Sequence, residues 1–121
     1  MGIRKLDLYI GGAWVPASST ETLDLVNPAT GDVIAQVPLA APEDMDAAAS
    51  SSAEGFSAWR RMAPAARCAI IRRAAGLLRE RLEAIATVMS SEQGKPLPEA
   101  RAETLRAAEL IEWAAEEGRR T

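Results

Sequence analysis

The stretch VIAQVPLAAPED, residues 33–44, contains the point at which the sequence changes from one kind of secondary structure to another. Its first part, Val33–Val37, is rich in apolar and β-branched residues and predicts a strand. Pro38 should end this strand, because proline has no N–H to donate to a ladder. Pro42 suits the first turn of a helix, and the acidic residues after it complement the positive end of a helix dipole. We therefore expect strands before this stretch and helices after it.

Short strands joined by tight turns are predicted upstream. Leu8–Ile10 and Ala13–Val15 flank Gly11-Gly12, a pair that can adopt the positive φ angles of a two-residue hairpin. Leu23–Leu25 alternates apolar and polar residues as a strand does. Asn27–Gly31 predicts a second turn, because asparagine caps turns, proline presets φ and glycine closes them.

Downstream, the apolar residues recur with helical spacing. One helix should run from Pro42 into Trp59, and the next should begin at Pro64, with apolar periodicity continuing to a cap at Gly94. A last helix is expected from about Pro98 to Arg120. The buried stripe predicted for the helix after Pro64 consists of Ile70, Ile71, Ala74, Leu77, Leu78 and Leu82. The small-residue face predicted for the last helix consists of Ala100, Thr104, Ala107, Ala108, Ile111 and Ala115.

The composition of the 121 residues excludes several classes of function. There is one cysteine and no histidine, so the chain cannot form an internal disulfide, a His/Cys zinc site or a histidine-dependent catalytic triad. The formal net charge is −3, and the arginines near residues 72–81 alternate with glutamates, which favours a solvated helix face over a nucleic-acid interface. No apolar run is long enough to span a bilayer or to act as a signal peptide, which favours a cytoplasmic location.

Two groups of residues are candidates for chemistry. Cys68 is the only conceivable nucleophile, but it borders the predicted apolar stripe and is better interpreted as a small core residue. Glu99 and Glu103 lie one helical turn apart, as paired catalytic carboxylates would, but Arg106 offers Glu103 an ordinary ion pair. The acidic cluster of the last helix is interpreted as a solvated face, and consists of Glu109, Glu112, Glu116 and Glu117. No catalytic residue is predicted in this chain.

Five motifs together resemble the opening of the NAD(P)-dependent aldehyde dehydrogenases. In chain order they are Leu8–Val15, Val26–Gly31, Trp59-Arg60, Glu92–Leu97 and Leu110–Trp113. Within that family, Glu92–Leu97 followed by Glu99-Ala100 and Ile111–Trp113 is most similar to the succinate-semialdehyde dehydrogenases. The resemblance covers nearly the whole chain.

The resemblance implies an α/β fold, with residues 1–121 as the N-terminal segment of a Rossmann-type coenzyme-binding domain that is incomplete on its own. Residues 1–40 would supply strands and turns, and residues 42–120 helices. The full-length enzyme would be a homo-oligomer that oxidises an aldehyde, such as succinate semialdehyde, through a cysteine thiohemiacetal, with hydride transfer to NAD or NADP and hydrolysis of a thioester. The catalytic and principal cofactor-binding groups would lie beyond Thr121. The partner of this chain would therefore be the remainder of the enzyme, and it would bind neither nucleic acid nor a membrane.

The resemblance also implies a monovalent cation site. Several members of the family use a backbone carbonyl from the segment that matches Val26-Asn27-Pro28 and a carboxylate just before the Gly-Lys-Pro segment. In this chain the two positions are Val26 and Glu92. Oxygen ligands suit a hard, singly charged ion. Alternatively, Glu92 accepts hydrogen bonds near the end of its helix.

A different class of function is also open at this point. The alanine-rich helix faces could belong to a self-standing, non-catalytic helical module that binds other proteins. Such a module should be well folded with a defined stoichiometry, whereas part of a larger enzyme should expose apolar surface.

Overall fold

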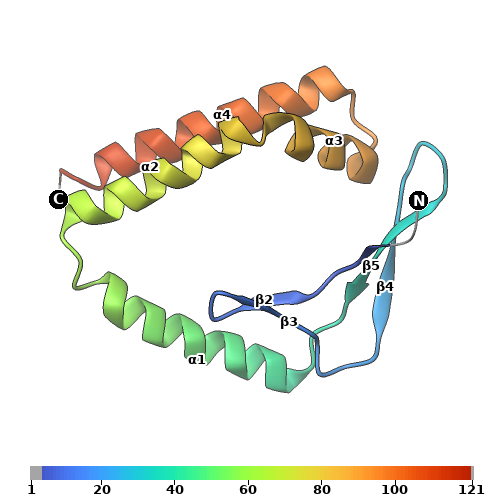
Figure 1. Cartoon of the computed structure of the whole chain (residues 1–121), viewed down its shortest axis with the longest axis horizontal. Coiled ribbons are helices and arrows are strands. Elements are labelled where there is room, and N and C mark those ends of the chain that lie inside the picture. Colours follow the sequence, from blue (N-terminus) through green and yellow to red (C-terminus); the bar gives the residue numbers. More distant parts are fainter. Residues whose placement is uncertain (1–3, 121) are drawn as a thin grey trace. The chain divides into compact units, whose positions relative to one another are not determined.

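The computed structural model describes residues 4–120. The chain divides into two compact units, one ending at Arg60 and the other beginning at Arg61, and each is described by itself. Figure 1 labels their elements.

The first unit contains the strands, in two small sheets. The five strands are β1 (Arg4–Lys5), β2 (Leu8–Ile10), β3 (Ala13–Val15), β4 (Thr22–Val26) and β5 (Val33–Pro38). One sheet has the order β1-β5-β4, in which β5 pairs parallel to β1 and antiparallel to β4. The other sheet is the antiparallel hairpin of β2 and β3. Ala35 of β5 is fully buried.

Both predicted turns are present. Gly11 and Gly12 have φ angles of 63° and 82°, the left-handed values that a two-residue hairpin requires at both central positions. In the second turn, the side-chain oxygen of Asn27 accepts a hydrogen bond from the Ala29 N–H at 2.9 Å. The backbone carbonyl of Asn27 accepts another from the Gly31 N–H at 2.8 Å. Local sequence thus decides both connections.

A buried carboxylate holds the start of helix α1 (Pro42–Trp59) to the loop before β4. Asp44 accepts hydrogen bonds from the Ser18 hydroxyl at 2.7 Å, the Ser18 N–H at 3.0 Å and the Ala41 N–H at 2.9 Å. The Ala41 bond is one of the two hydrogen bonds of a capping box, the one in which a side chain of the first helical turn accepts from the N-cap backbone. The second bond cannot form, because alanine has no side-chain oxygen. These bonds, the Ser18 hydroxyl first, lower the pKa of Asp44 below its ordinary value of 3.8.

Acid should release this contact. Because the pKa of Asp44 is lower in the folded chain than in the unfolded one, the contact stabilises the first unit above about pH 3.8, and this stabilisation is lost as pH falls through the lowered pKa. We expect the Ser18 and Ala41 amide resonances in an NMR titration to shift together with the protonation of Asp44. The Asp44→Asn variant should lack that transition and the Asp46→Asn variant should keep it. A transition that survives in Asp44→Asn would contradict the assignment.

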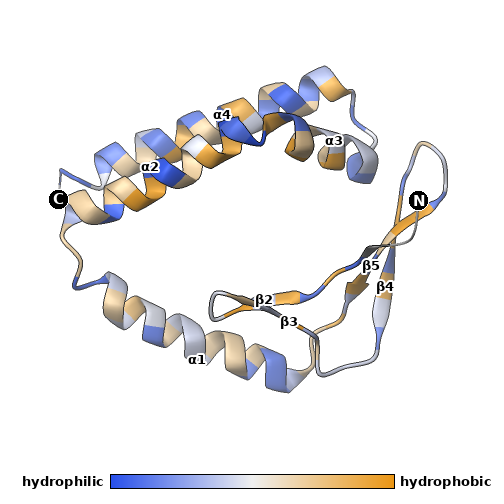
Figure 2. Cartoon of the chain, viewed as in Figure 1, coloured by the Kyte–Doolittle hydropathy of each residue, from blue (hydrophilic) through white to orange (hydrophobic). Residues whose placement is uncertain are grey.

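The second unit is helical and consists of α2 (Pro64–Glu80), α3 (Leu82–Gln93) and α4 (Leu97–Glu117). Figure 1 shows α2 and α3 following one another along α4, and both pack against it. Hydrophobic and hydrophilic residues alternate along all three helices in Figure 2, as expected for helices with one packed face.

Small residues form the core of the second unit. The predicted small-residue face of α4 is confirmed, with Ala100, Thr104, Ala108 and Ala115 buried. The predicted stripe of α2 is wrong in part, because Ile70 and Ala74 are exposed whereas Cys68 and Ala75 are buried. The face that packs is rotated toward the smaller residues, since small side chains let helices approach closely.

The apolar periodicity that continues past Glu80 is divided between two helices, α2 and α3. Arg81 adopts φ −102° and ψ 14°, outside the helical region, and separates α2 from α3. The predicted end of α3 is confirmed. Gly94 takes the left-handed conformation, with φ 74°, and its N–H donates to the Ser90 carbonyl at 2.9 Å.

The expected class of fold is confirmed, because short strands and their turns precede four helices in an α/β chain. No helix within residues 4–120 combines the length and the apolar character that crossing a bilayer requires.

Candidate functional site

Cys68 occupies a core position on α2, as the sequence predicts. Its residue surface is 4% exposed. Its Sγ lies 3.8 Å from Oε1 of Glu116 on α4, and the same oxygen accepts a hydrogen bond from Arg72 Nη1 at 3.1 Å. The thiol therefore faces a carboxylate already engaged by a guanidinium, and the chain contains no histidine that could act as its base.

Ion pairs join α2 and α4 on the helix faces that the sequence predicts to be solvated. Arg79 donates from both terminal nitrogens to the two carboxylate oxygens of Glu112, at 2.5 and 2.9 Å. Arg72, about two turns before Arg79 on α2, pairs with Glu116 of α4. The four side chains remain 37–58% exposed, as predicted for a solvated face, and they also pair with partners far apart in sequence across the seam between the helices. A bidentate pair of this kind also fixes the register of the two helices.

A third pair joins α3 to α4. Arg101 donates to both carboxylate oxygens of Glu83, with contacts of 2.9 and 2.8 Å. The hydrogen bonds from Arg101 lower the pKa of Glu83, and those to Glu83 raise the pKa of Arg101. Each charged form is therefore stabilised by the other.

The carboxylates Glu99 and Glu103 line a small hollow of about 300 Å³ with Lys95 and Arg106. The ion pair expected between Glu103 and Arg106 is replaced by one between Glu103 and Lys95. Lys95 follows Gly94, whose left-handed turn returns the chain toward the start of α4, so this pair could not be read from helical spacing.

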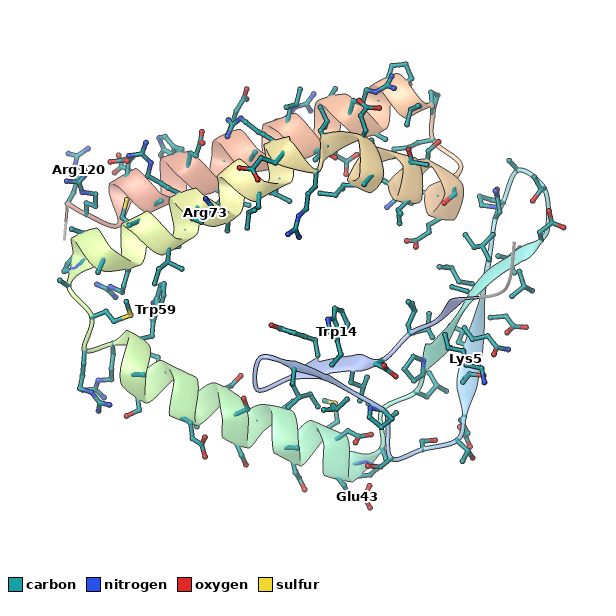
Figure 3. All side chains as sticks on the ribbon, viewed as in Figure 1. Lys5, Trp14, Glu43, Trp59, Arg73 and Arg120 are labelled. Carbon is teal, nitrogen blue, oxygen red and sulfur yellow. The ribbon has the colours of Figure 1, made fainter. Side chains whose placement is uncertain are left out.

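The hairpin and α1 enclose a cleft of about 540 Å³ within the first unit that the sequence did not predict. Its lining includes Gly11 and Gly12 of the hairpin turn and Ser51 and Ser52 of α1. Beside it, Trp14 and Tyr9 form a tilted aromatic pair with ring centroids 4.9 Å apart. Trp14 projects from the hairpin in Figure 3 and is 70% exposed. The cleft offers the hydroxyl groups of its two serines and the carboxylate of Glu54.

The two predicted cation ligands lie in different units. Val26 ends β4 opposite Val33, and the pairing shifts register between Leu25 and Val26. The residue that this shift leaves without a partner is Ile34 of β5, and Val26 itself is paired. Glu92 is in the last turn of α3. Because each is described within its own unit, the site that would join them stays a prediction.

No group of three or more His, Cys, Asp or Glu side chains in residues 4–120 is placed to hold a metal ion. Three arginine–glutamate pairs join the helices of the second unit.

Comparison with known proteins gives consistent matches. The model of the aldehyde dehydrogenase family matches residues 14–121. The chain is 41% identical over 113 residues to malonate-semialdehyde dehydrogenase 2 of Bacillus mycoides, covering 93% of this chain and 23% of that protein. It is 40% identical over 111 residues to the NADP(+) succinate-semialdehyde dehydrogenase of Escherichia coli, covering 92% and 23%.

Solved structures agree. An NAD-dependent aldehyde dehydrogenase from Sinorhizobium meliloti matches with a TM-score of 0.92 and 32% identity, over 98% of this chain and 24% of that one. The chain spans about a quarter of the length of the curated relatives it matches. The family match extends across the strands of the first unit from Trp14 onward and all three helices of the second. The chain belongs to the aldehyde dehydrogenase family.

Proposed function

We propose that this chain is the N-terminal part of the coenzyme-binding domain of an enzyme that oxidises an aldehyde to a carboxylate with NAD or NADP. The observation that carries the proposal is the match of residues 14–121 to the aldehyde dehydrogenase family. The fold supports it, because the structures that the chain resembles are aldehyde dehydrogenases. The relatives include NAD-dependent and NADP-dependent proteins, so both cofactors are compatible with the proposal.

Succinate semialdehyde is the substrate we propose. The similar proteins include dehydrogenases named for malonate, succinate and glutarate semialdehydes, which share a carboxylate at the far end of a short aldehyde. The Glu92–Leu97 motif favours the succinate-semialdehyde group among them. The enzyme would be a cytoplasmic homo-oligomer.

The role of this chain within such an enzyme would be structural. Cys68 is buried in the seam between α2 and α4, and the ion pairs of that seam hold the helices in register. The nucleophile, the general base and the cofactor cleft would come from the remainder of the enzyme. The alternative, a self-standing interaction module, has less support, because the family match covers most of the chain and the similar proteins are named as dehydrogenases.

The 121-residue chain should therefore give no aldehyde-dependent NAD(P)H. We expect absorbance at the wavelength of the reduced cofactor to stay at the buffer blank with succinate semialdehyde and either cofactor. The full-length E. coli relative serves as the positive control. Turnover that disappears in the Cys68→Ala variant would show that the chain carries its own nucleophile, and would overturn the proposal.

We also propose that a monovalent cation binds the full enzyme through the Val26 carbonyl and the Glu92 carboxylate. The chemistry of this donor set fits, since one carboxylate with carbonyls and water suits a weakly held singly charged ion. Further ligands would come from the rest of the enzyme.

The thermal stability of a full-length enzyme containing this chain tests the cation site. The midpoint of unfolding should be higher in sodium or potassium than in a bulky organic cation, because an ion that binds only the folded state stabilises it. Glu92→Ala should remove the difference, and Glu99→Ala should keep it. Equal midpoints in the three salts for the unaltered protein would exclude the site.

A further inference from the structure

We draw no further inference here: the strongest candidate, the cleft between the β2–β3 hairpin and α1, carries none because nothing in the structure shows what occupies or covers it.

Discussion

Replacing Ala108 by leucine is expected to destabilise the helical unit by about 1–3 kcal/mol, because added methylenes in a packed core force side chains off their rotamers and shift the backbone. Ala108 is fully buried on α4, and the other fully buried residues of this unit are also alanines. A seam made of methyl groups allows the helix backbones to approach closely. A leucine side chain at this position has no space without separating the helices.

Ala114→Leu is the matched control for this change. It lies on the same helix and adds the same atoms, but at an exposed position, so its effect should stay within about 0.5 kcal/mol. Hydrogen exchange of the α2 and α4 amides measures the opening of this unit separately from that of the strands. If the two leucine variants exchanged at the same rates, the seam would not be closely packed.

A loss of stability in Ala108→Leu would also affect the ion pairs of the seam. Arg79 and Glu112 are each more than a third exposed, so their pairing alone contributes little. It depends on α2 and α4 remaining close, which the alanines permit. Packing therefore determines the stability of the unit, and the charges determine the register of its helices.

The features that the sequence predicted correctly depend on neighbouring residues. The Gly11-Gly12 hairpin and the left-handed cap at Gly94 each need a positive φ angle, which glycine supplies at no steric cost. The change from strand to helix between Pro38 and Pro42 likewise follows from proline chemistry.

The features that could not be predicted join residues far apart in the chain. Asp44 reaches Ser18 across 26 positions, and Arg72 reaches Glu116 across 44. The buried face of α2 was misplaced in part because an alanine-rich helix has more than one apolar stripe, and only the approach of α4 selects Ala75 rather than Ile70. The two cation ligands were predicted from the resemblance to the family, because hydrophobic periodicity cannot indicate which backbone carbonyl binds an ion.

The largest effect is expected when this chain replaces the matching segment of a related enzyme, because the resulting chimera is either active or inactive. In the chimera, this chain replaces the matched segment of the E. coli succinate-semialdehyde dehydrogenase, to which it is 40% identical. If the chain is part of the coenzyme-binding domain, the cofactor and catalytic groups of the E. coli protein should keep their positions. The exchange of a similar supporting segment should then leave a working enzyme.

The control chimera carries the matched segment of the Bacillus mycoides malonate-semialdehyde dehydrogenase 2, a family member that is 41% identical to this chain. If this control chimera is also inactive, the junctions are the cause; if it is active, the cause lies in the sequence of this chain. A third chimera with Ala108→Leu in this chain should lose activity on mild heating before the first does, because the helical unit is weakened.

The decisive measurement is kcat/KM of the first chimera with succinate semialdehyde and NADP. We predict a value within about 100-fold of the parent enzyme, since small misplacements far from the reacting atoms cost up to about that factor. A chimera that folds but has no detectable turnover, beside an active control chimera, would contradict the proposal that this chain forms part of an aldehyde-oxidising enzyme.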